Sequence, residues 1–312
     1  MEINPSNSIF VFPGQGSQFA GMGKDLNEIN HPLAIINKAE KILDISLSEI
    51  FSETNPEILN NTKIAQPAIM LISLAYFELV KHYNGKQFRE PKFWAGHSLG
   101  EYTALVASNT ITLKEGLNLI SKRALFMEQA SKQFPGGMIA VIGLELNQIE
   151  NVLKETSAEI ANINSKNQIV ISCKNDAIEK TLELCKEAGA RQAIKLPVSG
   201  AFHSKLMIPA QNKLNQHIDA ISFKKPTSPI ICNTNKMVTS NPNILKEELK
   251  NQLCNCVNWQ NSIEIAVNEG IECLVEIGPG KILRNLFKRD YPSLNVVSLN
   301  NVETIKETPF LL

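Results

Sequence analysis

The chain has 312 residues, and its 31 lysines and arginines are balanced by 31 aspartates and glutamates. With 43% hydrophobic and 20% charged residues, the composition is that of a globular protein of about two domains, which excludes disordered, collagen-like and coiled-coil chains. Because the net charge is zero, the chain lacks the basic excess of a general nucleic-acid or membrane-surface binder.

Apolar runs alternate with helical patterns in the first third of the chain. Pro13-Gly14 ends the first apolar run, and Gln66-Pro67 is the expected start of the first helix because proline is favourable in a first turn. Apolar residues at three- and four-residue spacing predict a longer amphipathic helix. In chain order the sequence predicts a strand, a helix, a strand and two helices, at residues 9–12, 66–80, 93–96, 99–107 and 113–127.

A different order of elements follows. Strands alternate with helices as β-α-β-β-α-β, the ferredoxin-like arrangement, at residues 138–144, 147–157, 159–162, 168–172, 176–189 and 192–196. The earlier alternation then resumes at 205–220, 230–232, 258–269, 273–277, 281–289 and 296–299. We therefore predict an α/β fold: a larger hydrolase-like α/β domain, residues 1–131 and 199–312, with an inserted ferredoxin-like subdomain at 132–198.

The cysteines and apolar segments predict an intracellular protein. Six cysteines without a Cys-x-x-Cys pair suit the cytoplasm or an organelle stroma. The pair Cys254-x-Cys256 has no nearby histidine, so we expect neither a metal nor another cofactor. The longest strongly apolar stretch, 68–77, falls short of the roughly 20 residues that a membrane span needs, and no signal peptide is evident.

The segment Gly96-His97-Ser98-Leu99-Gly100 lies between a predicted strand and a predicted helix. In that context Gly-x-Ser-x-Gly forms a nucleophile elbow, in which the glycines allow a tight turn that exposes the serine hydroxyl. The N–H groups at the start of the helix can then stabilise the oxyanion formed during acyl transfer. The alternative is a glycine-rich turn with a solvated serine.

A serine nucleophile needs a base, and His203 is the best candidate. It follows a strand end that runs into a loop, where functional residues collect; a structural loop histidine is the alternative. His97 adjoins the serine and can have only a supporting role. The other histidines lie in polar surroundings and are expected at the surface: His31, His82 and His217.

The carboxylate of an α/β-hydrolase triad is missing. The triad order is Ser, Asp or Glu, then His, and the only aspartate between Ser98 and His203 is Asp176, which is typical of a helix N-cap. An esterase or lipase is therefore disfavoured, and a Ser–His dyad that is oriented by another group is favoured.

A second glycine-rich segment is Phe12-Pro13-Gly14-Gln15-Gly16-Ser17-Gln18. It lacks the third glycine of a dinucleotide-binding fingerprint and the Lys-Ser/Thr of a phosphate loop. What remains is a turn that exposes a backbone amide and the Gln15 side chain, and without further context a plain surface turn is the simpler interpretation.

Four segments together resemble one family, the malonyl-CoA:acyl carrier protein transacylases, from about residue 8 to 300. They are the Gln15 turn, the Ser98 elbow, Ser199-Gly200-Ala201-Phe202-His203-Ser204 and Glu276-Ile277-Gly278-Pro279-Gly280-Lys281. The resemblance implies transfer of malonyl from malonyl-CoA to acyl carrier protein through a malonyl-serine, for fatty acid synthesis. A polyketide acyltransferase, a serine thioesterase or hydrolase, and a non-catalytic carrier-binding module are the alternatives.

The resemblance also implies roles for individual residues. Ser98 is the acylated nucleophile, and His203 is the base, oriented by a main-chain carbonyl near Gln252. Gln15 and the Leu99 N–H form the oxyanion hole. The free carboxylate of the malonyl group is held by Arg123, which by itself would be expected at the surface. Further substrate contacts are expected from His97, Met127, Asn162 and Asn164.

Two positions bear on substrate and loop shape. In related polyketide acyltransferases a large aromatic before the histidine accompanies malonyl units, so Phe202 implies malonyl rather than methylmalonyl. One methyl group is worth only about 1–3 kcal/mol in an apolar pocket. Cys256 stands where the family often has proline, so the loop after Gln252 is expected to depart in shape from the family's.

A basic cluster contrasts with the neutral average. Lys281, Arg284 and Lys288 share one face of a predicted helix, in a stretch without acidic residues. A solvated helix face is the simpler interpretation, and docking of an acidic carrier protein is the alternative. We expect a monomer.

Overall fold

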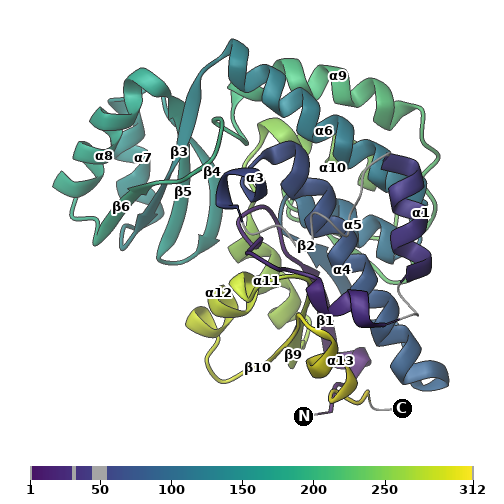
Figure 1. Cartoon of the computed structure of the whole chain (residues 1–312). Coiled ribbons are helices and arrows are strands. Elements are labelled where there is room, and N and C mark those ends of the chain that lie inside the picture. Colours follow the sequence, from purple (N-terminus) through teal and green to yellow (C-terminus); the bar gives the residue numbers. More distant parts are fainter. Residues whose placement is uncertain (1, 30–32, 44–54, 311–312) are drawn as a thin grey trace.

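The computed structural model describes residues 2–29, 33–43 and 55–310, and one of the histidines expected at the surface, His31, lies outside them. The larger part of the molecule is a six-stranded sheet of order β10-β9-β1-β2-β7-β8 (Figure 1). All pairs are parallel except the last. The strands are β1 (Ser8–Phe12), β2 (Phe93–Gly96), β7 (Ile230–Ile231), β8 (Val238–Thr239), β9 (Cys273–Ile277) and β10 (Asn295–Leu299).

Both faces of this sheet are covered, which is why β1 is apolar at nearly every position. Phe10 and Phe12 pack into a cluster with α4, α5 and α6, whereas Ile9 and Val11 pack with α11 and α12 on the opposite face. The helices of the larger part are α1 (Leu33–Leu43), α3 (Pro56–Leu59), α4 (Thr62–Asn84), α5 (Leu99–Ala107), α6 (Leu113–Gln133), α9 (Ile208–Asp219), α10 (Pro242–Asn251), α11 (Trp259–Asn268), α12 (Ile282–Asp290) and α13 (Val302–Lys306).

Helix α4 begins four residues before the predicted Gln66-Pro67 start. Asn61 caps it by accepting a hydrogen bond from the Lys63 N–H, and Pro67 lies inside the helix. The proline deprives only the Lys63 carbonyl of its helical donor, and Lys63 is exposed, so water can replace that donor. The stretch Thr62–Gln87 has the length and hydropathy (1.4) of a membrane span, contrary to the sequence estimate, but 83% of its apolar window is buried inside the fold, as in a core helix.

A second sheet stands beside the first, with α7 and α8 on one side of it (Figure 1). Its four strands are antiparallel in the order β4-β5-β3-β6. Its elements are β3 (Gly136–Ile142), α7 (Leu146–Lys154), β4 (Glu159–Ser165), β5 (Gln168–Lys174), α8 (Ile178–Glu187) and β6 (Gln192–Lys195). Strand β4 contacts the larger part, because Asn162 bridges to Val257 in the loop before α11.

The predicted strands and helices are present with shifted ends, and some elements were missed. Helix α10 was missed although it begins with Asn241 as N-cap and Pro242 in the first turn, both recognisable start signals. Helices α1 and α13 and the two-residue strand β8 were also missed.

Candidate active site

The Ser98 elbow lies at the carboxyl end of β2, where α5 begins. Chain packing explains both glycines. A Cβ added to Gly100 would lie 2.0 Å from the Phe12 carbonyl oxygen at the end of β1, and one added to Gly96 would lie 1.9 Å from the Gly100 carbonyl carbon. Only glycines let the strand, the turn and the helix pack this closely, and the turn then presents Ser98 at the sheet edge where α/β folds bind ligands.

Ser98 and His203 are in contact although 105 residues separate them: the Ser98 Oγ lies 2.7 Å from His203 Nε2. The other ring nitrogen, Nδ1, lies 3.0 Å from the main-chain carbonyl oxygen of Gln252. A carbonyl can only accept, so Nδ1 carries the proton and Nε2 is left free to accept the serine proton. The main-chain carbonyl thus has the orienting position that a carboxylate has in a triad.

The base is poised in its neutral form. His203 is 4% exposed, and burial, followed by the positive charge of Arg123, lowers the pKa of His203 to about 3. An imidazole with that pKa stays neutral, and able to accept a proton, over the whole range in which an ordinary histidine titrates.

The lowered pKa predicts a flat pH profile on the acid side. Between pH 8 and pH 5, kcat/KM for acylation by malonyl-CoA should not fall with protonation of His203, because kcat/KM reports the free enzyme and His203 there is neutral above about pH 3. Stopped-flow acylation rates across this range provide the check. A loss of half the rate near pH 6.5, the ordinary histidine value, would contradict this account.

Arg123 lies in the interior, 1% exposed, rather than at the surface where an isolated arginine is expected. Its guanidinium donates to Ser98 Oγ (2.9 Å) and to the side-chain oxygens of Gln66 (2.8 Å) and Gln252 (3.3 Å). It also lies over the Tyr102 ring, 5.3 Å from the centroid. Burial lowers the pKa of Arg123, but an arginine remains cationic. The site therefore holds a fixed positive charge directly beside the serine.

Gln15 and Gln66 support this cation from the loop after β1 and from α4. Gln66 Nε2 donates to Gln15 Oε1 (3.2 Å), and Gln15 Nε2 donates to Thr62 Oγ1 (3.3 Å). The Gln15 side chain is thus already engaged with α4. The main-chain N–H groups of Gln15 and Leu99 have no acceptor within the described part of the chain, so both are free to donate to an oxyanion, whereas one Gln15 Nε2 hydrogen is engaged with Thr62.

A cavity of about 270 Å³ contains nearly all of the predicted site residues. Its polar lining includes Gln15, Gln66, His97, Ser98, Arg123, Asn162, Asn164 and His203, and its apolar lining includes Met127, Met138, Val170, Leu196, Val198 and Phe202. Gln252 and Leu99 do not line it: the Gln252 carbonyl oxygen contacts His203, and the Gln252 side chain contacts Arg123. The cavity lies between the two sheets, with Met138, Asn162, Asn164 and Val170 contributed by the second one.

His97 has a supporting position. Its Nε2 lies 2.8 Å from Asn164 Oδ1, and its ring lies 5.6 Å from that of Trp259. Burial lowers the pKa of His97, which keeps the ring neutral. The contact ties the elbow to β4 of the second sheet, and so joins the two walls of the cavity.

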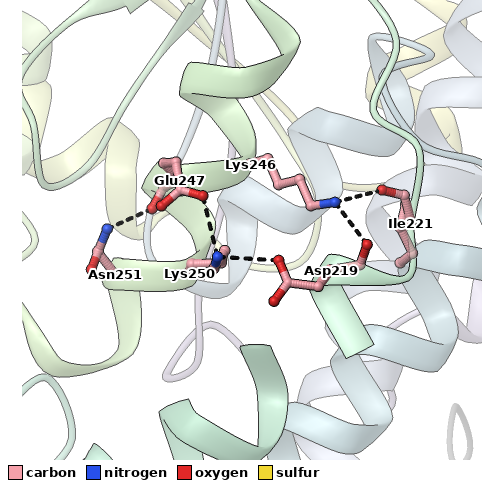
Figure 2. A network of polar contacts seen from close by, with 6 residues as sticks. All are labelled: Asp219, Ile221, Lys246, Glu247, Lys250 and Asn251. Atoms are coloured by element: carbon pink, nitrogen blue, oxygen red, sulfur yellow. Dashed lines mark hydrogen bonds and ion pairs between the residues drawn. The ribbon is translucent and has the colours of Figure 1, made fainter. Parts of the chain in front are cut away.

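The segment that carries Gln252 is held from outside the site. It directly follows α10, and Figure 2 shows how α10 is tied to the end of α9: Lys250 Nζ pairs with Asp219 (3.1 Å) and Glu247 (3.2 Å). Lys246 Nζ donates to the carbonyl oxygens of Asp219 (2.9 Å) and Ile221 (3.0 Å). These contacts connect the last turns of α10, which directly precede Gln252, to the end of α9, although exposed ion pairs contribute little to stability.

Sequence reasoning missed three buried residues next to the nucleophile: Gln66, Glu101 and Asn233. Glu101 and Asn233 contact the elbow from below rather than from the cavity. Glu101 directly follows the elbow in the sequence, so this acidic residue could have been noticed, whereas nothing in the local sequence distinguishes Gln66 or Asn233.

Within the described residues, no group of three histidine, cysteine, aspartate or glutamate side chains is placed to hold a metal ion. All six cysteines are free thiols. Cys254 and Cys256 are half-buried, and burial raises the pKa of both thiols, to about 12 and about 11.

Comparison with known proteins now places the chain. The acyl transferase domain matches residues 9–307. The chain belongs to this acyl transferase family. It is 38% identical over 307 residues, 96% of both chains, to a malonyl CoA-acyl carrier protein transacylase of Bacillus subtilis (strain 168). A similar match is the enzyme of that name from Escherichia coli (strain K12), with 36% identity over 297 residues, 93% of this chain and 95% of the relative.

Solved acyltransferases share the fold. An acyl-carrier-protein-S-malonyltransferase from Bartonella henselae superposes with a TM-score of 0.92 at 34% identity, covering 96% of this chain and 98% of that one. A malonyl-transacylase solved in complex with its type II polyketide acyl-carrier protein gives a TM-score of 0.91 at 33% identity, with the same coverage. The mixed α/β architecture, with a parallel sheet and flanking helices, is therefore that of the family.

Proposed function

We propose that this protein transfers a malonyl group from malonyl-CoA to the phosphopantetheine thiol of an acyl carrier protein. The observation that carries the proposal is the position of Ser98 Oγ, within 2.7 Å of His203 and 2.9 Å of Arg123 at one cavity. A serine and its base fit any acyl transfer, and a buried cation beside them fits an acyl group with a free carboxylate. Relatives named as malonyl transacylases support this substrate.

The reaction has two steps with the same residues. Ser98 Oγ attacks the thioester carbon while His203 Nε2 takes its proton, and the main-chain N–H groups of Leu99 and Gln15 stabilise the oxyanion. The tetrahedral intermediate collapses, CoA leaves as the thiol with the proton from His203, and a malonyl ester stays on Ser98. The carrier thiol then attacks the ester, His203 again acting first as base and then as acid.

Arg123 is assigned to the malonyl carboxylate. Its fork of N–H donors matches a carboxylate in two parallel hydrogen bonds. Among the residues that the structure describes, its NH1 and NH2 groups donate to neutral oxygens, those of Gln66, Gln252 and Ser98. A carboxylate would supply the missing negative charge, and an acetyl group would not. Met127 and Phe202 complete the apolar wall around the acyl chain.

A transfer assay separates this function from a hydrolase. With labelled malonyl-CoA and a holo-acyl carrier protein, label should move to the carrier much faster than free malonate appears. Malonate release at the same rate with and without carrier would favour a thioesterase or hydrolase. Carrier binding that persists in Ser98→Ala, without turnover in the wild type, would favour a non-catalytic carrier-binding module. The same assay with a fatty-acid carrier and with a polyketide carrier tests whether the malonyl group is supplied to fatty acid synthesis.

Phe202 limits the substrate. It is buried, and its ring lines the cavity, where it occupies the room that an α-methyl group needs. Phe202→Ser should raise kcat/KM for methylmalonyl-CoA relative to malonyl-CoA by about 10-fold or more, the range expected for one methyl group. Competition between the two thioesters in one assay measures the ratio, and an unchanged ratio would remove Phe202 from specificity.

We also propose that the carrier docks on the basic face of α12. Lys281 and the neighbouring Ile282 are exposed, and Ile282 lies beside the turn at Gly16, next to the cavity. Lys281 and Lys288 are exposed and Arg284 is half-buried. Because Lys288 Nζ also donates to the carbonyl oxygens of Pro292 and Leu294, we test Lys281 and Arg284.

Charge reversal tests the docking surface. Lys281→Glu with Arg284→Glu should raise KM for the carrier several-fold and leave acylation by malonyl-CoA unchanged, because surface charges act mainly on association. Lys186→Glu, on α8 of the second sheet, is the matched control. An unchanged KM for the carrier would reject this surface.

We also propose that the chain is divided into two domains. The elements β3 to β6 follow a β-α-β-β-α-β order, and their sheet has its own apolar core, which supports a ferredoxin-like subdomain at 132–198 inserted into an α/β domain at 1–131 and 199–312. Six free thiols support a reducing compartment such as the cytoplasm.

We propose that the protein acts as a monomer, since one chain supplies every residue used above.

A further inference from the structure

The nucleophile has a backbone conformation that serine rarely adopts. Ser98 has φ 53° and ψ −104°, and only four non-glycine residues in the described part of the chain have a positive φ, His203 among them. Such conformations persist only where the surroundings hold them, and they concentrate at functional sites. The elbow glycines allow this turn, but they do not by themselves keep Ser98 in it.

The Asn233 side chain forms hydrogen bonds with main-chain groups on both sides of the turn. Asn233 Oδ1 accepts a hydrogen bond from the Ser98 N–H (2.7 Å), and Asn233 Nδ2 donates to the Gly96 carbonyl oxygen (2.8 Å). The amide therefore spans the elbow from below with both of its ends. Asn233 comes from the end of β7, the strand that pairs with β2 in parallel, so sheet topology delivers it to the elbow.

Asn233 is itself fixed. It is 0% exposed, its N–H donates to Glu101 Oε1 (3.3 Å), and its carbonyl accepts from the Asn258 N–H (2.8 Å). The second Glu101 oxygen accepts from Gln252 Nε2, which also donates to the Ser98 carbonyl oxygen at 2.9 Å. The N–H and the C=O of Ser98 are thus each held by a side-chain amide, and the Glu101 carboxyl joins the Asn233 main chain to the Gln252 side chain.

We infer that Asn233 is a positioning residue for acyl transfer: its amide holds the Gly96–Ser98 turn so that Ser98 Oγ stays against His203 and the Leu99 N–H stays free for the oxyanion. The inference rests on the proposed function. Asn233 does not touch the substrate cavity, so it acts through Ser98 alone. Its loss should lower the rate of the chemical step and leave substrate binding nearly intact.

The chain contains a matched control. Asn84, at the end of α4, is also buried and also clasps two main-chain groups, with Nδ2 donating to the Val80 carbonyl oxygen (2.9 Å) and Oδ1 accepting from the Phe310 N–H (3.1 Å). Asn84→Ala therefore removes the same pair of hydrogen bonds far from Ser98. Any general cost of losing a buried amide clasp should be alike in Asn84→Ala and Asn233→Ala.

The experiment measures single-turnover acylation by malonyl-CoA, per mole of folded protein. Asn233→Ala should lower the maximal acylation rate by about 10²-fold, the effect of a displacement of about 1 Å at a reacting group, with the half-saturating malonyl-CoA concentration changed less than threefold. Reaction of Ser98 with phenylmethylsulfonyl fluoride, which needs no malonyl site, should slow in parallel. Asn84→Ala should change neither rate.

If Asn233→Ala does not fold, Asn233→Ser is measured in its place, since a hydroxyl fits the space but is too short to span both peptide groups. Rates within threefold of wild type in the folded variant, or equal losses in the Asn233 and Asn84 variants, would overturn the inference. A wild type that is not acylated would instead overturn the proposed function, so the two failures are distinguishable.

Discussion

Replacement of His203 should lower the rate of Ser98 acylation by about 10⁴-fold or more, as loss of the base does in other serine acyl-transfer sites. The side chain is the only base in contact with Ser98 Oγ in the described part of the chain, through Nε2 at 2.7 Å. Without it the hydroxyl proton has no acceptor, and a neutral serine is a poor nucleophile. Single-turnover acylation by malonyl-CoA measures the loss.

The choice of variant matters because His203 has φ 55°. Alanine is strained in this left-handed region, whereas asparagine tolerates it, so His203→Asn removes the base with the smaller effect on the backbone. His217→Ala, an exposed histidine on α9, is the control and should have wild-type rates. A His203→Asn protein that is folded and loses less than tenfold would show that another group takes the serine proton.

Arg123→Ala should lower kcat/KM for malonyl-CoA by about 10²–10³-fold, the equivalent of about 3–4 kcal/mol, as expected for a carboxylate that loses two charge-assisted hydrogen bonds. Acetyl-CoA has no carboxylate, so its slow transfer should be relatively spared and the preference for malonyl should largely disappear. The ratio of the two kcat/KM values is the measurement. Equal losses for both thioesters would reject the carboxylate role.

Arg123→Ala should also destabilise the fold, and this effect can be measured separately from the loss of malonyl preference. Loss of the guanidinium leaves the side-chain oxygens of Gln66 and Gln252 buried without this donor, which destabilises the fold. Thermal unfolding therefore accompanies the kinetics. Arg123→Lys keeps the charge but not the planar fork, and should recover only part of the malonyl preference. Arg191→Ala, at an exposed position just before β6, should change neither property.

Much of the site could be predicted because its chemistry follows from short motifs. The pattern around Ser98 requires glycines for close packing. The only aspartate between Ser98 and His203 is Asp176, which is typical of a helix N-cap, so the sequence favours a dyad oriented by another group. A main-chain carbonyl at Gln252 fills that place. Arg123 could be placed only through the family resemblance, because an arginine beside an amphipathic stripe looks like a surface residue until its tertiary partners are known.

The residues that sequence reasoning missed are amides that make long-range contacts. Asn233 lies 135 residues from Ser98, and Gln66 lies 57 residues from Arg123. A buried asparagine or glutamine is identified by the main-chain groups it satisfies, and these are fixed by strand order rather than by local pattern. Conversely, Pro67 predicts a helix start at Gln66, whereas α4 begins at Thr62 and contains the proline, at a point where Lys63 is exposed.

The central claim is that Ser98 carries the malonyl group between the two thiols. Intact-mass spectrometry after mixing the protein with malonyl-CoA, without carrier protein, tests it directly. We expect a single malonyl adduct that maps to the peptide containing Ser98, disappears when holo-acyl carrier protein is added, and is absent in Ser98→Ala. An unmodified wild-type protein, or an adduct that persists unchanged in Ser98→Ala, would contradict the account.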